Sequence, residues 1–160
     1  MEGFRFTMSA FTEDMIVSAT SDPNRRKSWM PPGFLPQNWV VEKELPYAVG
    51  SLEHPTEMII VPKGFVFNGH SVPLGLRWLF PRAHSIYLQA AALHDYLYHD
   101  RHWPGTRRKA DAIYFEALHE VLGVNRFWAK TMWLGVRVGG WIPWRKARRY
   151  KSDGREQLAK

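Results

Sequence analysis

The sequence predicts an α+β fold, in which a small N-terminal β-sheet region is followed by a three-helix unit. Two observations lead to this prediction. Short apolar runs bounded by turn residues fill the first part of the chain, whereas apolar residues at helical spacing fill residues 85–139. With 160 residues, of which 45% are hydrophobic, the chain can bury one sizeable core. We therefore expect a single domain over residues 1–144 and a basic tail over residues 145–160.

The strands are expected between turn signals. Proline and glycine turns predict a loop over residues 22–36, and the first strands are expected at residues 39–45 and 57–61. A further short strand leads to Asn68-Gly69, a pair that accepts positive φ and so favours a sharp turn. This turn would present His70 from a loop.

Three helices are expected in the second half, each with a start or stop signal. They are residues 85–99 with Ser85 as N-cap, residues 107–122 ending before a glycine, and residues 126–139 with Asn125 as N-cap.

The composition excludes several classes of protein. The chain contains no cysteine, so it has neither a disulfide framework nor a thiolate metal site. Its N-terminus lacks a basic flank followed by an apolar run, so we expect no signal peptide. The longest apolar stretch, residues 127–144, is interrupted by Lys130 and Arg137 and is a poor membrane span.

The net charge of +7 is concentrated at the C-terminus, where residues 145–160 hold seven basic and two acidic side chains. Such a tail is most often a solvated end, but it can also contact nucleic acid or an anionic membrane. Trp141 and Trp144 lie beside it, and tryptophan near arginine is typical of interaction surfaces. Core packing of these tryptophans is the alternative, and nucleic-acid binding is the least favoured function.

The most informative stretch is residues 90–100, where a run of small apolar residues ends in ionisable groups. His94 and Tyr98 are four residues apart and share one helix face, whereas Asp95 lies on the next face. On the following helix, Asp111 lies on the apolar stripe. A short connection makes the two helices antiparallel neighbours. We therefore expect Asp111 to reach His94.

This cluster suggests two interpretations. A buried carboxylate would fix the tautomer of His94, as a general base that activates water requires. Asp95 would then hold a cation, and the loop residues His70 and Asn68 would complete a site for calcium or zinc. Alternatively, the His-Asp-Tyr network only locks two helices together, since buried ionisable clusters are also structural.

Several of these segments resemble a family of uncharacterised bacteriophage and prophage proteins. The resemblance rests on the GF-x5-S-V-P motif at residues 64–73, the H-D-Y-L-Y motif at residues 94–98, residues 108–111 and residues 135–137. It covers about residues 57–140. The resemblance implies a phage origin but no established activity.

The helix pair is also similar to that of phospholipase A2. That resemblance implies that His94 activates water, that Asp95 binds calcium and that Asp111 orients His94, with Tyr98 supporting the carboxylate.

These observations lead to two hypotheses about function. The first is a phage-encoded, metal-assisted hydrolase of an ester or amide in the cell envelope, either phospholipase A2-like or directed at peptidoglycan. The second is a non-enzymatic virion or tail accessory protein that meets phage or envelope components through Trp141, Trp144 and the tail. Both hypotheses predict a protein of the host cytoplasm or the virion.

Overall fold

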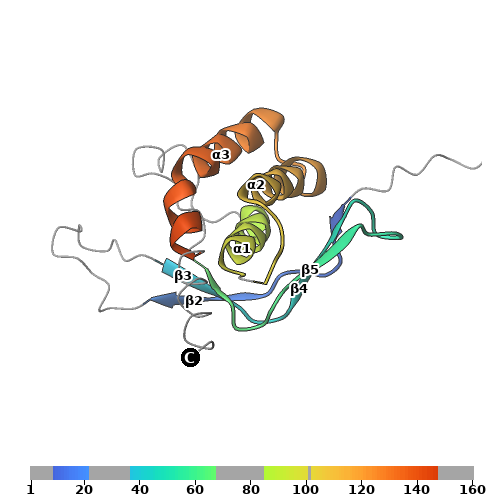
Figure 1. Ribbon diagram of the computed structural model, residues 1–160. Coiled ribbons are helices and arrows are strands. Elements are labelled where there is room, and N and C mark those ends of the chain that lie inside the picture. The colour runs from blue at the N-terminus through green and yellow to red at the C-terminus, as the bar shows by residue number, and fades with distance from the viewer. Residues whose placement is uncertain (1–8, 22–36, 68–84, 101, 148–160) are drawn as a thin grey trace, which may run out of the picture. The chain divides into compact units, whose positions relative to one another are not determined.

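The computed structural model describes residues 9–21, 37–67, 85–100 and 102–147 (Figure 1). The chain divides into two compact units, Met1–His70 and Ser71–Lys160. The first unit contains strands and the second contains helices, so the predicted α+β class is confirmed. The expected single domain over residues 1–144 remains a prediction.

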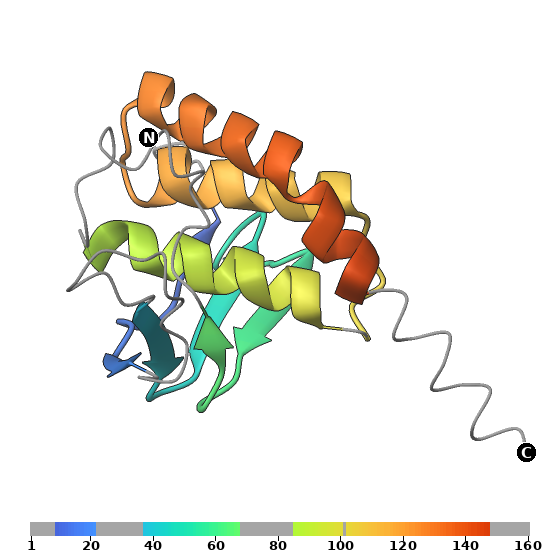
Figure 2. The same ribbon diagram turned by 90° about the vertical axis from the view of Figure 1, so that its left-hand side faces the viewer.

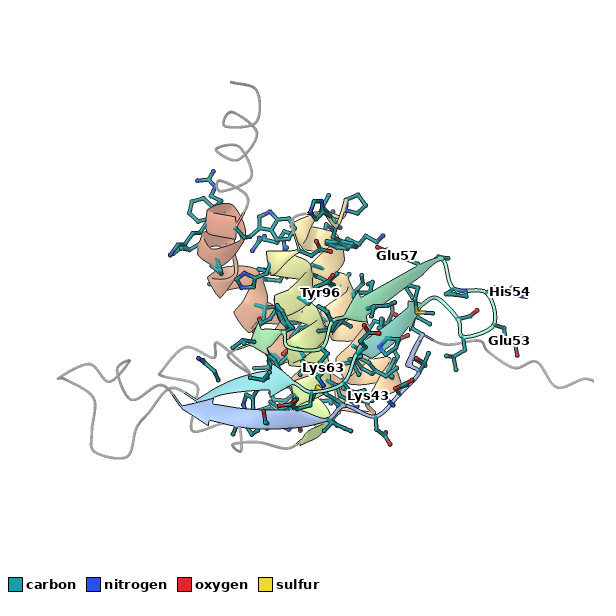
Figure 3. All side chains as sticks on the ribbon, turned by 90° about the horizontal axis from the view of Figure 1, so that it is seen from below. Lys43, Glu53, His54, Glu57, Lys63 and Tyr96 are labelled. Atoms are coloured by element: carbon teal, nitrogen blue, oxygen red, sulfur yellow. The ribbon has the colours of Figure 1, made fainter. Side chains whose placement is uncertain are left out.

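The first unit contains two antiparallel sheets of three strands each. One sheet has the order β1-β4-β5, formed by Ala10–Phe11, Leu45–Val49 and Glu57–Val61. The other has the order β2-β3-β6, formed by Val17–Ser21, Gln37–Val41 and Val66–Phe67. Glu53 and His54 lie on the exposed loop that joins β4 to β5 (Figure 3).

Side chains alternate between buried and exposed along β5, as expected for a strand with one covered face. Ile59 and Val61 are buried, whereas Met58 and Ile60 are exposed. On the neighbouring strand, the buried ring of Tyr47 meets Phe11 edge-on, with ring centroids 4.8 Å apart.

The prediction of one strand over residues 39–45 was wrong, because the segment belongs to two strands in different sheets. β3 ends at Val41, whose N–H donates to the Phe65 carbonyl at 3.0 Å and whose carbonyl accepts from Gly64 at 2.7 Å. The exposed charged residues 42–44 then turn the chain, and β4 begins at Leu45. β1 and β2 have no counterpart among the strands predicted from the sequence. β6 corresponds to the short strand expected before residue 68.

The second unit is helical; its first and third helices have the predicted bounds, whereas the α-helical part of the second ends at Glu116. α1 is Ser85–His99, α2 is Arg107–Glu116 and α3 is Arg126–Gly139. α2 lies between α1 and α3 (Figures 1 and 2). Residues 141–147 are also helical, so helical structure reaches into the first residues of the expected tail.

Local signals explain where these helices begin and end. The Asn125 side chain accepts a hydrogen bond from Phe127 N–H at 2.9 Å and caps α3 as predicted. Thr106 caps α2 in the same way, accepting from Lys109 N–H at 3.2 Å. The predicted second helix ends differently from an ordinary α-helix, since Ala117–Val121 forms the π-helical turn η3 before Gly123 at φ +67°.

Two further expectations concern residues outside the described part of the chain, and a third concerns membrane-spanning helices. The Ser85 side chain and the turn at Asn68-Gly69 both lie outside the described part of the chain. Among the described helices, none has the length and apolar character needed to cross a membrane.

Candidate functional site

The candidate site is built around the carboxylate of Asp111, which is completely buried in α2. Its Oδ1 lies 3.0 Å from His94 Nε2 and also accepts the hydroxyl hydrogen of Tyr98 at 2.6 Å. Its Oδ2 accepts a hydrogen bond from Arg137 Nη1 at 2.6 Å. One buried carboxylate therefore has three partners, two from α1 and one from α3.

These partners keep Asp111 ionised. Burial on its own raises the pKa of the carboxyl group, but hydrogen bonds from His94, Tyr98 and Arg137 outweigh burial and hold the pKa below its ordinary value. An ionised carboxylate only accepts hydrogen bonds. The hydrogen between His94 and Asp111 therefore resides on Nε2, and in the neutral imidazole Nδ1 carries the lone pair.

Tyr98 is held in its neutral form. Burial raises the pKa of its hydroxyl group strongly, and the hydrogen bond to Asp111 raises it further. The hydroxyl therefore remains a donor at all physiological pH values. The Tyr98 ring also lies against His94, with ring centroids 4.2 Å apart, as expected for residues four apart on one helix.

Arg137 of α3 and two residues that follow this helix, Gly140 and Trp144, also contact the site. Arg137 is 29% exposed, and its backbone carbonyl accepts a hydrogen bond from Arg107 Nη1 at 2.9 Å. The Trp144 ring meets Tyr98 edge-on at 5.1 Å. Gly140 faces the same ring so closely that an added Cβ atom would lie 2.5 Å from the Tyr98 hydroxyl oxygen. The chain can therefore pass Tyr98 at this point only because residue 140 is glycine.

The second nitrogen of His94 faces a different carboxylate. Nδ1 lies 4.0 Å from Asp95 Oδ1, and the Asp95 side chain is 28% exposed. The Tyr114 ring packs beside the imidazole at 4.8 Å. Complete burial and the negative charge of Asp95 both raise the pKa of Tyr114, which remains neutral. Nδ1 of the histidine is therefore next to a partly exposed negative charge.

Residues 39–136 match the model of a family described as "Protein of unknown function (DUF1353)". The chain belongs to the DUF1353 family. Membership of an uncharacterised family is thereby confirmed, whereas the phage origin and the likeness to phospholipase A2 stay predictions. The match includes His94, Tyr98 and Asp111 and ends one residue before Arg137. No curated protein and no solved structure is significantly similar to the chain.

The DUF1353 chain brings together the three residues predicted as catalytic, His94, Tyr98 and Asp111. Of the predicted metal ligands, Asp95 lies beside His94, whereas Asn68 and His70 lie outside the described residues. In the described segments of the DUF1353 chain, no three His, Asp or Glu side chains are grouped to hold a metal ion.

The two tryptophans predicted to meet partners have different surroundings. Trp141 is 50% exposed, and the Arg145 guanidinium lies over its ring at 4.0 Å. Trp144 is only partly exposed and packs against Tyr98.

Arg137, the third partner of Asp111, was not among the site residues predicted from the sequence. A signal was available, because a buried carboxylate requires compensating donors or charge, and Arg137 interrupts the apolar stretch of the third predicted helix. The close approach of Gly140 to Tyr98 had no signal in the sequence, because it depends on how α1 meets the residues after α3.

Proposed function

We propose that this DUF1353 protein is a hydrolase of an ester or amide in the cell envelope, with His94 as its general base. One observation carries the proposal. Asp111 accepts the Nε2–H of His94, so Nδ1 is the nitrogen with the basic lone pair. This Nδ1 lies beside the partly exposed Asp95 carboxylate. A histidine oriented by a buried carboxylate is the arrangement that water activation requires.

In this mechanism, Nδ1 of His94 accepts a proton from a water molecule as the water oxygen attacks the carbonyl carbon of the substrate. The resulting imidazolium is stabilised by the negative charge of Asp111, which stays ionised because Tyr98 and Arg137 also donate to it. The imidazolium then returns the proton to the leaving group. General base catalysis of this kind contributes roughly 10² to 10⁴-fold to the rate.

The proposal includes a divalent cation, calcium or zinc, with Asp95 as a ligand. When bound, such an ion would supply positive charge to the developing oxyanion of the substrate. A partly exposed carboxylate next to the base fits one position of such a site. The other ligands predicted from the sequence, His70 and Asn68, lie in segments that the structure does not describe.

A second candidate function is that of a non-enzymatic virion or tail accessory protein. Its support is the burial of the network. The His94 side chain is only 7% exposed, and the Asp111 carboxylate joins α1, α2 and α3. In that case, the same hydrogen bonds would stabilise the helical unit and would have no catalytic role.

The substitution His94→Gln separates these two functions. The amide N–H of the introduced glutamine retains a donor for Asp111, but the side chain has no basic nitrogen. Substrates are phosphatidylglycerol vesicles and isolated peptidoglycan, each with calcium, with zinc and with a chelator. We expect hydrolysis of one substrate by the parent protein and at least a roughly hundredfold lower rate for His94→Gln. The exposed Glu120→Gln variant serves as the control and should retain the parent rate.

Two results would contradict the hydrolase proposal. One is the absence of hydrolysis by the parent protein under every condition. The other is an unchanged rate in a folded His94→Gln protein. The first result would favour the virion or tail accessory protein, whereas the second would exclude His94 as the general base.

A further inference from the structure

α3 and the helical residues after it are apolar on two opposite sides. One side is buried through Ala129 and Met132. The other side is exposed. Five large apolar side chains, each at least 50% exposed, form what we call the α3 apolar surface: Phe127, Leu134, Val138, Trp141 and Ile142.

The spacing shows that these exposed residues are not scattered. Within α3, Phe127, Leu134 and Val138 are separated by seven and four residues, which places them on one side of the helix. Trp141 and Ile142 follow directly in the helical residues 141–147. A single exposed leucine needs no explanation, but a row of large apolar side chains along one helix marks an interaction surface.

The charged residues of the segment that carries this surface all have one sign. From residue 126 to residue 152 the sequence contains no Asp or Glu, and it contains eight basic residues: Arg126, Lys130, Arg137, Arg145, Lys146, Arg148, Arg149 and Lys151. Arg137 is engaged by Asp111, whereas Arg126, Lys130, Arg145 and Lys146 are exposed. The surface therefore complements an anionic partner.

We propose that the α3 apolar surface docks on the surface of an anionic phospholipid bilayer. A helix with exposed Trp, Phe and Leu together with Lys and Arg has the composition of helices that lie in the membrane interface. Trp141 with Arg145 over its ring combines an apolar body with a cation, which suits the boundary between acyl chains and charged headgroups.

Two other occupants fit the surface less well. Nucleic acid also attracts basic residues, but the aliphatic side chains of Leu134, Val138 and Ile142 cannot stack on bases, and they would remain in water. A second copy of the chain would bring two basic surfaces together with no acidic residue in residues 126–152 to compensate. A bilayer accommodates both the aliphatic side chains and the positive charge.

This inference is independent of the chemistry of His94. Docking can be present in a protein without catalysis, and the reverse also holds. If both proposals are correct, the α3 apolar surface would bring a phospholipid hydrolase to its substrate.

Vesicle co-sedimentation of the full chain tests the proposal. The vesicles contain either phosphatidylcholine alone or equal parts of phosphatidylcholine and phosphatidylglycerol. We expect binding to the anionic vesicles only. The triple variant Leu134→Ser, Val138→Ser, Ile142→Ser should bind at least about tenfold more weakly, because it removes the apolar contribution. The matched control replaces three exposed apolar residues of the other unit, with Ile16→Ser, Met58→Ser and Ile60→Ser, and should bind like the parent.

The electrostatic part of the proposal has its own matched pair. Lys130→Gln should weaken vesicle binding by roughly fivefold, since each basic residue near an anionic membrane contributes on this scale. Lys63→Gln, which changes an exposed lysine of the other unit, should not alter binding. The His94→Gln variant should bind vesicles like the parent, so that failure of catalysis and failure of docking are recorded separately.

Three outcomes would overturn the docking proposal. The first is the absence of binding to anionic vesicles. The second is binding that the serine triple variant leaves unchanged. The third is a parent protein that sediments as a dimer in the ultracentrifuge while the serine triple variant is monomeric, which would assign the surface to a second copy of the chain.

Discussion

His94 Nε2 lies 3.0 Å from Asp111 Oδ1 in the interior of the helical unit. Because hydrogen bonds hold the pKa of Asp111 below its ordinary value, this contact fixes both the orientation of the imidazole and the nitrogen that carries the hydrogen. The stability of the helical unit and the chemistry of His94 therefore depend on the same carboxylate.

Asp111→Asn should lower the free energy of unfolding by about 3 kcal/mol, because the variant leaves Arg137 without its counter-charge and directs an amide group at hydrogen-bond donors. Urea unfolding followed by circular dichroism measures this change. Glu120→Gln, on the exposed side of η3, should stay within about 0.5 kcal/mol of the parent. A loss below about 1 kcal/mol for Asp111→Asn would show that the network adds little to stability.

The lowered pKa of Asp111 also predicts how stability depends on pH. A carboxyl group whose pKa is lower in the folded state stabilises the protein at pH values above its pKa in the unfolded state, which is about 3.9 for Asp. This contribution is lost as the pH falls through the folded value. Between about pH 5 and pH 2, the parent should therefore lose more unfolding free energy than Asp111→Asn. Parallel losses in urea titrations of both proteins would contradict the ionised state of Asp111.

Tyr98→Phe removes one donor to a charged acceptor and should cost roughly 1.5 to 3 kcal/mol of unfolding free energy. A double-mutant cycle with Asp111→Asn isolates the contribution of this hydrogen bond. We expect the two substitutions together to cost at least about 1 kcal/mol less than the sum of their separate effects. Simple additivity would mean that the Tyr98 hydroxyl and Asp111 do not interact.

Gly140 and Gly135 form a matched pair for testing the packing around Tyr98. Gly140→Ala should destabilise the protein by about 1 to 3 kcal/mol, because the new Cβ atom meets the Tyr98 hydroxyl and the Val136 carbonyl oxygen. At Gly135, within α3, an added Cβ meets nothing within 4 Å, so Gly135→Ala should stabilise the helix by about 0.5 to 1 kcal/mol. Thermal unfolding of the two variants should therefore change in opposite directions. Equal changes would contradict the close approach at residue 140.

Much of the helical unit could be predicted from the sequence because its signals are local. Thr106, Asn125 and Gly123 mark helix ends through side-chain capping or positive φ, which depend on neighbours in the chain. The contact between His94 and Asp111 was also accessible, because a carboxylate on an apolar stripe next to an antiparallel helix has few other partners.

The features that were missed depend on distant parts of the chain. Residues 39–45 are divided between two strands because β3 pairs with β2 and β6 in one sheet, whereas β4 pairs with β1 and β5 in the other. Local β propensity does not contain this information. Arg137 reaches Asp111 across 26 positions of sequence. The sequence showed a buried acid, but the packing of α3 determined which cation would meet it.

In the neutral form of His94, Asp111 binds the Nε2–H and Nδ1 carries the lone pair. The most direct test is a long-range ¹H–¹⁵N correlation spectrum of ¹⁵N-labelled protein, recorded at a pH where the imidazole is neutral and assigned through His94→Gln. We predict a protonated Nε2 and an unprotonated Nδ1 for His94. A protonated Nδ1 with an unprotonated Nε2 would contradict both the hydrogen bond to Asp111 and the proposed role of His94 as the base.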